Sequence, residues 1–312
     1  MKIANRSPSI KNKSYSVDQS PFFKLKSKKK LAKILGVSLA DIKNLSSDSS
    51  YRVFTTESGR TIEEPLPRLK SLHRRIGKLL NRVELPAYLH SGRKKHSTIT
   101  NASSHQNAIE LLKLDIQKFF PSSRATKVYK MFNELFCMSP DVAYLITNIV
   151  TYSGKVPTGS PISMSIAYWA NKPMFDQLND LAIGKGLVFT TYVDDVAFSG
   201  KKIPKGLSGE VKRIIESNGL LAKKNKERFY PSYRGKLLTG VIIRNGDLSV
   251  RFSHNQSMRD VMVNLSKADG IDKIRCLEVL SGKLNAAGQI ENRFRDRARF
   301  FSKILKDERS KF

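Results

Sequence analysis

Residues 188–199 read Val-Phe-Thr-Thr-Tyr-Val-Asp-Asp-Val-Ala-Phe-Ser. Apolar and β-branched residues flank the central Tyr192-Val193-Asp194-Asp195, and this pattern predicts two short strands joined by a tight turn. Asp194 and Asp195 would then lie at the tip of a hairpin whose arms are buried. An Asp-Asp turn taken alone is more often an ordinary solvated turn, so its chemical meaning depends on a second acidic element.

Asp115 is that second element, because it lies within the mostly apolar run 111–120, which predicts a further strand. A lone buried carboxylate is costly unless it is paired or bound to a cation. If this strand lies beside the hairpin, three carboxylates converge and repel one another, and hard divalent cations relieve such repulsion. The pattern therefore predicts a site for two Mg²⁺ ions, with Mn²⁺ as the alternative, suited to phosphoryl transfer.

The net charge indicates a polyanionic partner. The 312 residues include 56 Lys and Arg against 27 Asp and Glu, a formal charge of +29. Nucleic acid is the expected counter-charge. Near the C-terminus four arginines fall within about two helical turns, which predicts either a face that follows nucleic-acid phosphates or a merely solvated face. These residues are Arg293, Arg295, Arg297 and Arg299.

Composition excludes several other classes of protein. Two cysteines rule out a disulfide framework. No apolar run approaches the roughly 20 residues of a spanning helix, and the N-terminus lacks the apolar segment of a secretory signal. We expect a cytoplasmic protein that has no membrane partner, with a length that suits about two domains.

Local patterns predict the main elements around these motifs. The clearest is a hairpin over residues 241–252 with Asn-Gly at its turn. A second hairpin is expected over 51–64, an amphipathic helix over 69–80 and a long helix over 164–183. From residue 253 onward the chain is expected to be helical and basic.

The order of three motifs resembles the palm of reverse transcriptases. Residues 114–121 are similar to motif A, 156–161 to motif B and 192–195 to motif C, while 219–226 resembles motif D. Together with the hairpin expected over 51–64, which corresponds to the fingers, the resemblance spans roughly residues 60–252.

Two further elements resemble the retron branch of bacterial reverse transcriptases. Asn101-Ala102-Ser103-Ser104-His105 is similar to its Asn-Ala-x-x-His element, and Leu238-Thr239-Gly240 to its Val-Thr-Gly element, with Leu in place of Val. The resemblance implies RNA binding through residues of these two elements. For His105 it favours an RNA-related use over the alternative of an ordinary structural histidine. The implied RNA-binding residues are Asn101, His105, Thr239 and Gly240.

The retron resemblance also implies a function and partners. Such enzymes copy a partner noncoding RNA into multicopy single-stranded DNA (msDNA), typically priming from a guanosine 2′-OH. They serve in anti-phage defence with an effector protein. The expected partners are therefore a structured RNA, its DNA product, dNTPs and an effector.

The implied fold is α+β, a right-hand polymerase with an antiparallel palm sheet, mixed fingers and a helical thumb. Residues 1–21 are expected to form a basic arm, and 22–113 the fingers and N-terminal helices. The palm is expected over 114–253, with part of the fingers interleaved, and the basic thumb over 254–312.

Site roles carry over onto the matching positions. Asp115, Asp194 and Asp195 would be catalytic and hold the metals, with the Ile116 carbonyl as a backbone ligand. Phe120 matches the family's steric gate against a 2′-OH, which favours a DNA product; otherwise it is a core aromatic. Thr158 is a departure, since many relatives carry Gln there. The implied nucleotide-binding residues are Phe120, Thr158, Gly159, Lys226, Arg60 and Lys70.

Three functions remain open from the sequence. The first is a retron-type RNA-directed DNA polymerase, which is a nucleotidyltransferase. The second is a reverse transcriptase of another branch, either group II intron-like or diversity-generating. The third is a non-catalytic RNA-binding protein with a palm fold, although binding a polyanion gives no reason to cluster carboxylates.

Overall fold

The computed structural model describes residues 14–311 and groups them into two compact units. Within the described residues, the first unit takes 14–93, Ile116–Leu178 and Val211–Ala222, and the second takes the remaining segments. The chain crosses between the units after Arg93, Asp115 and Ala222. It also crosses within two helices, α9 (Lys172–Gly184) and α10 (Leu207–Ser217). The predicted domain borders stay a prediction.

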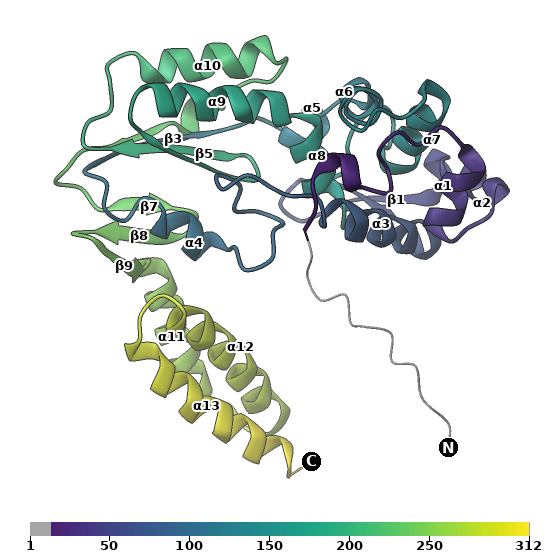
Figure 1. The fold of residues 1–312 in the computed structure, drawn as a ribbon. Helices are drawn as coiled ribbons and strands as arrows, with labels where there is room; N and C mark the ends of the chain where they lie inside the picture. Colours follow the sequence, from purple (N-terminus) through teal and green to yellow (C-terminus); the bar gives the residue numbers. More distant parts are fainter. Residues whose placement is uncertain (1–13, 312) are drawn as a thin grey trace, which may run out of the picture. The chain divides into compact units, whose positions relative to one another are not determined.

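The first unit is mainly helical and contains one two-stranded hairpin (Figure 1). Phe22, Phe132 and Phe136 are fully buried, and their rings make edge-on or tilted contacts at its core. Its complete elements are α1 (Lys28–Leu35), α2 (Leu39–Leu45), β1 (Tyr51–Thr55), β2 (Thr61–Pro65), α3 (Pro67–Leu80), α5 (Phe119–Ser122), α6 (Ala125–Lys130), α7 (Pro140–Val150) and α8 (Ser163–Ala170).

The hairpin predicted over 51–64 is confirmed in the first unit. Tyr51 lies opposite Pro65 and Thr55 opposite Thr61 in antiparallel pairing. After Tyr51, strand β1 is exposed along its length, whereas β2 buries Glu63 and Pro65. The hairpin pairs with no other strand in the described chain.

The second unit carries two antiparallel sheets. One has the order β4-β5-β3-β6 and the other β7-β8-β9. Leu111, Ala197 and Val241 share one buried cluster with Ala102 of helix α4, which packs the two sheets together. The elements are α4 (Thr98–Ser103), β3 (Glu110–Asp115), β4 (Val188–Tyr192), β5 (Asp195–Gly200), β6 (Arg228–Tyr230), β7 (Lys236–Leu238), β8 (Val241–Arg244) and β9 (Asp247–Val250).

Three helices complete the second unit: α11 (Phe252–Leu265), α12 (Gly270–Gly288) and α13 (Arg293–Arg309). They lie side by side (Figure 1) around a small apolar core that includes Leu280 and Leu284. We call residues 252–309 the C-terminal helices. The predicted α+β class, with an antiparallel sheet at the aspartates and a helical C-terminal segment, is confirmed.

Two predicted elements differ from the structure. The strand expected over 111–120 ends at Asp115, and the chain turns through Lys118 at φ 48° into α5. The helix expected over 164–183 is broken at Asn171, whose amide nitrogen donates to Ser123 Oγ at 2.8 Å. Pro173, two residues later, has no backbone N–H to continue the first helix, so it also favours the break at Asn171.

The predicted N-terminal arm lies partly outside the described residues, which begin at Ser14. From Tyr15 onward the described chain contacts the rest of the first unit. Tyr15 pairs with Val83 in an isolated β-bridge, and Ser20 is buried.

Candidate functional site

The Asp-Asp motif lies at a tight turn between β4 and β5, as predicted. Val193 adopts a positive φ of 59°, which closes the turn in two residues. Tyr192 then pairs with Asp195 as the last rung of the hairpin. Asp194 and Asp195 are half-buried at the end of the sheet.

Strand β3 lies beside this hairpin and brings the third carboxylate to it. Asp115 is directly opposite Asp195 in antiparallel register, and it is 5% exposed. Opposed residues of an antiparallel pair project from the same face. Burial raises the pKa of Asp194, and the charges of Asp115 and Asp195 raise it further. The three carboxylates therefore converge and repel one another, as the sequence predicted.

Two lysines neutralise the carboxylates. Lys226 Nζ lies 2.6 Å from Asp115 Oδ2, and Lys113 Nζ lies 3.0 Å from Asp195 Oδ2. The hydrogen bond to Asp115 raises the pKa of Lys226. Sequence reasoning placed Lys226 near a triphosphate and missed Lys113. The signal for Lys113 was its position two residues before Asp115, which puts both side chains on one face of the strand.

The donor chemistry suits hard divalent cations, because carboxylate oxygens are their preferred ligands. Within residues 14–311, no three His, Cys, Asp or Glu side chains are grouped to hold a metal ion as they stand. The ammonium groups of Lys226 and Lys113 instead supply the positive charge at two of the carboxylates. Asp115, Asp194 and Asp195 therefore suit a divalent cation, which would neutralise them in place of the two lysines.

The other positions implied for nucleotide binding lie in the first unit, except Lys226. Phe120 follows Asp115 by five residues, is half-buried and contacts Phe119 with ring centroids 5.8 Å apart. Arg60 is exposed beside the turn of the β1–β2 hairpin. Lys70 Nζ lies 2.7 Å from Glu64 Oε1, so its charge is already paired. Ile116 is fully buried.

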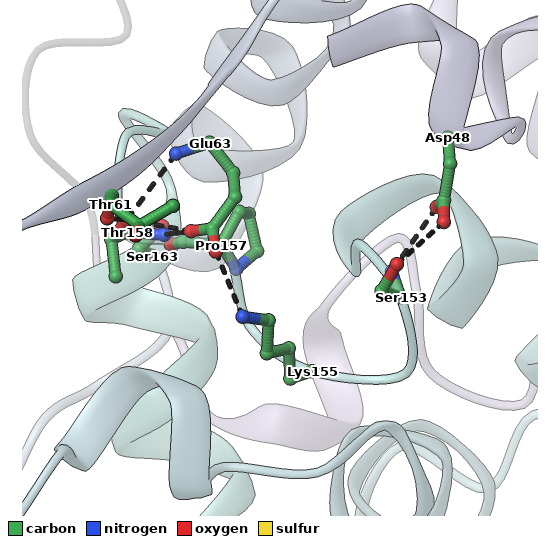
Figure 2. A network of polar contacts seen from close by, with 8 residues as sticks. All are labelled: Asp48, Thr61, Glu63, Ser153, Lys155, Pro157, Thr158 and Ser163. Carbon is green, nitrogen blue, oxygen red and sulfur yellow. Dashed lines mark hydrogen bonds and ion pairs between the residues drawn. The ribbon is translucent and has the colours of Figure 1, made fainter. Parts of the chain in front are cut away.

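Thr158 lies against strand β2 (Figure 2), and Gly159 bonds the same strand. The Thr158 hydroxyl is 2.6 Å from Glu63 Oε2 and 2.9 Å from the Thr61 carbonyl, and the Gly159 N–H donates to the Glu63 carbonyl at 3.1 Å. A hydroxyl has one hydrogen, and these two acceptors compete for it. The sequence around Glu63 did not predict its contact with this loop, because its partners are about a hundred residues away in the chain.

The two retron-like elements meet in the second unit. Asn101 Nδ2 donates to Thr239 Oγ1 at 3.3 Å, and Thr239 Oγ1 donates to the Thr98 carbonyl at 3.1 Å. Thr239 and Gly240 also line a cavity of about 290 Å³ together with Lys283. The bond between Asn101 and Thr239 joins residues 138 positions apart in the chain.

His105 is fully buried rather than presented at a surface. Its ring nitrogens lie 2.6 Å from Ser199 Oγ and 2.7 Å from Thr190 Oγ1. The imidazole thus joins the segment after α4 to strands β4 and β5. This placement favours the structural alternative for His105.

The four predicted arginines on helix α13 fall into two pairs with different surroundings. Arg293 and Arg297, four residues apart, line a cleft of about 140 Å³ with Arg259 of α11. Arg295 instead donates to the Gly288 carbonyl at 2.9 Å, and Arg299 lies 3.5 Å from Asp296. Sequence reasoning missed Arg259, because a single arginine on α11 carries no pattern.

Comparisons with known proteins agree with the predicted resemblance. No family model matches the chain. The Retron Se72 reverse transcriptase of Salmonella heidelberg is 33% identical over 175 residues, which cover 53% of this chain and 45% of that protein. The Retron Ec86 reverse transcriptase of Escherichia coli is 27% identical over 63% of this chain and 64% of its own length. The Retron Mx162 reverse transcriptase of Myxococcus xanthus is 25% identical over 70% of this chain and 53% of its own length.

The chain therefore spans about half to two thirds of the curated relatives it matches. Among solved structures, a foamy viral protease-reverse transcriptase in complex with RNA/DNA hybrid covers 83% of this chain at 14% identity and a TM-score of 0.44. The resemblance to retron-type reverse transcriptases is confirmed by the sequence comparisons. In the described part of the chain, no helix is both long and apolar enough to cross a membrane.

Proposed function

We propose that this chain, similar in sequence to retron reverse transcriptases, is an RNA-directed DNA polymerase of retron type. The observation that carries the proposal is the register that sets Asp115 opposite Asp195 with Asp194 at the adjoining turn. A protein of charge +29 that only bound nucleic acid would gain nothing from three clustered carboxylates, because their negative charge repels the phosphates. It is the arrangement that nucleotidyl transfer needs.

Asp115, Asp194 and Asp195 would hold two Mg²⁺ ions, with the Ile116 carbonyl as a further ligand. When bound, such ions lower the pKa of the attacking hydroxyl and neutralise charge on the transferred phosphate. Lys226 and Lys113 hold two of the carboxylates without metal. Under the proposal, Lys226 turns toward the anionic triphosphate when its carboxylate partner is neutralised.

The remaining roles follow from the other positions. Phe120 excludes a nucleotide 2′-OH, so that dNTPs are used. Arg60 and Lys70 bind the triphosphate, and Lys70 must leave Glu64 to do so. The Gly159 backbone lies close to the nucleotide.

The RNA partner is proposed to contact the surface around Thr239 and Gly240. Lys283 gives the neighbouring cavity a positive group. Asn101 supports this surface through its bond to Thr239, and His105 supports it from the interior. The C-terminal helices, which we assign as the thumb, bind phosphates through Arg259, Arg293 and Arg297.

The proposed product is msDNA copied from a noncoding RNA and primed from a 2′-OH, with an effector protein completing an anti-phage system. To test this, the protein is expressed with its native flanking DNA, and the nucleic acid that copurifies is treated with RNase and debranching enzyme. A discrete single-stranded DNA whose mobility shifts on debranching, and which is missing with Asp194→Asn, is expected. DNA of any other kind contradicts the retron type. RNA without DNA also contradicts the retron type, and primer extension by the purified protein then distinguishes a reverse transcriptase of another branch from a non-catalytic RNA-binding protein.

A further inference from the structure

Glu63 on strand β2 is a buried carboxylate that holds the 157–161 loop. It is 2% exposed. Its Oε1 lies 2.8 Å from Lys155 Nζ, and its Oε2 accepts the Thr158 N–H at 2.8 Å and faces the Thr158 hydroxyl at 2.6 Å (Figure 2). All these residues lie in the first unit.

The carboxylate is ionised in this setting. Burial alone would raise its pKa, but Lys155 and Thr158 donate hydrogen bonds and hold the pKa below its usual range. Hydrogen bonds to an ionised acceptor are roughly twice as strong as neutral ones. Removing a donor from a buried carboxylate leaves it undersolvated, so each of these contacts is expensive to lose.

The backbones of the loop and the strand also touch. The Gly159 N–H donates to the Glu63 carbonyl at 3.1 Å. A Cβ added at Gly159 would lie 2.7 Å from that same oxygen and 2.7 Å from Ile62 Cγ2. Only glycine permits this approach, so the loop is seated directly on β2.

Glu63 holds the middle of β2 on the loop. The base of the hairpin is held separately, because Tyr51 packs against His73 and Tyr152 and Lys70 Nζ lies 2.7 Å from Glu64 Oε1. The two strands of the hairpin pair only with each other in the described chain, and β1 is exposed beyond Tyr51. An isolated two-stranded hairpin is marginally stable. Its turn is internally rigid, since the Thr56 N–H donates to the Arg60 carbonyl at 2.9 Å. The direction in which the hairpin projects therefore determines where Arg60 lies.

We infer that Glu63 is a positioning residue that latches the β1–β2 hairpin to the 157–161 loop and thereby sets the affinity for the incoming nucleotide. The inference rests on the proposed function, in which Arg60 and the Gly159 backbone contact that nucleotide. Thr158 then acts by bonding Glu63, and its hydroxyl is not the nucleotide contact that a Gln would provide at this position.

Thr158→Val tests the latch, because valine keeps the shape of threonine and removes only the hydroxyl. We expect KM for dNTPs to rise about tenfold, as the loss of one charge-assisted bond implies, with kcat changing far less. Thr158→Ser, which keeps a hydroxyl, should restore KM. Glu63→Gln should raise KM as well, and combining it with Thr158→Val should add little.

Ser153→Ala is the matched control, because it removes a serine-to-carboxylate bond (2.8 Å to Asp48 Oδ2) elsewhere on the same segment. Its KM should match wild type. If Thr158→Val leaves KM unchanged, or lowers kcat alone, the inference is overturned.

A second readout needs no polymerase activity. Hydrogen exchange of a peptide covering residues 156–162 should be faster in Thr158→Val and Glu63→Gln than in wild type and Ser153→Ala. A weakened latch lets the loop open from β2 more often, and each opening breaks the bonds that the Thr158 and Gly159 amides make to Glu63. Unchanged exchange overturns the latch itself. If the wild-type protein incorporates no dNTP while exchange still changes, the proposed function fails and the latch stands.

Discussion

Asp115 on β3 and Asp195 on β5 face each other directly across an antiparallel ladder, and each is bound by a different lysine. The ladder fixes the separation of the two carboxylates, because every rung from Glu110–Gly200 onward is in register. Asp115 and Asp195 therefore belong to a rigid sheet, and Asp194 lies at the two-residue turn that adjoins it.

Lys113→Gln should destabilise the metal-free protein. Lys113 and Asp195 are about one-fifth exposed, so losing the ammonium leaves a mostly buried carboxylate beside two others. We expect a loss of about 2 kcal/mol in the free energy of unfolding, less than for a fully buried pair. Adding Mg²⁺ should raise the Tm of the variant more than that of wild type. Equal Tm shifts would mean that Lys113 does not neutralise a cation site.

Phe120→Ala should relax the choice of sugar. The ring is proposed to exclude the 2′-OH, so the ratio of kcat/KM for dNTP over rNTP should fall by about tenfold or more. Single-nucleotide incorporation with dGTP and GTP measures this ratio. An unchanged ratio would return Phe120 to the role of a core aromatic packed on Phe119.

Arg259→Ala combined with Arg297→Ala should weaken nucleic-acid binding in a salt-dependent way. Each phosphate contact contributes about 0.7 to 0.9 to the slope of log K against log salt, so the slope should become shallower. The control is Arg275→Ala, since Arg275 is 74% exposed on α12 and paired with Asp272. Filter binding between low and moderate salt gives both slopes. Identical slopes in the double variant and the control would rule out a phosphate cleft between α11 and α13.

His73 should make stability fall as pH falls. It is fully buried. Its Nε2–H donates to the Ile149 carbonyl at 2.7 Å, and Nδ1 accepts from Ser160 Oγ at 2.6 Å. Burial lowers the pKa of His73 from 6.5 to about 4. Between these values the unfolded chain binds a proton that the folded chain does not, so stability rises with pH.

The expected loss is about 3 kcal/mol between pH 7 and pH 4. Urea unfolding of wild type and His73→Gln at several pH values isolates this contribution, because the other titrating groups are shared. The wild-type curve should be steeper below pH 6.5. Parallel curves would show that His73 titrates normally.

Local sequence patterns sufficed where the determinants were local. The Asn245-Gly246 turn has φ values of 52° and 81°, as the two-residue hairpin requires, and Gly36 ends α1 with a φ of 72°. The Ser38 side chain caps α2 by accepting the Asp41 N–H. The aspartates could be placed because a polar residue in an apolar strand is unusual and needs an explanation.

Patterns failed where a distant partner decides the conformation. The break at Asn171 is only partly of this kind. Ser123 and Lys127 bond its side chain, but Pro173, two residues later, is a local signal for a helix end. Glu63 resembles any acidic residue of an exposed hairpin until the 157–161 loop packs on it. Such partners are far away in the chain, so no window of sequence contains both.

The central proposal is that Asp115, Asp194 and Asp195 form a metal-dependent nucleotidyl-transfer site. The most direct measurement is incorporation of a single dNTP onto a primer annealed to RNA, with and without Mg²⁺, by wild-type protein and by Asp194→Asn. Asn keeps the size of the side chain, and circular dichroism and Tm verify the fold. The proposal predicts Mg²⁺-dependent incorporation by wild type and a loss of more than about a hundredfold in the variant. Equal incorporation by a folded Asp194→Asn protein, or incorporation that persists without divalent metal, would contradict it.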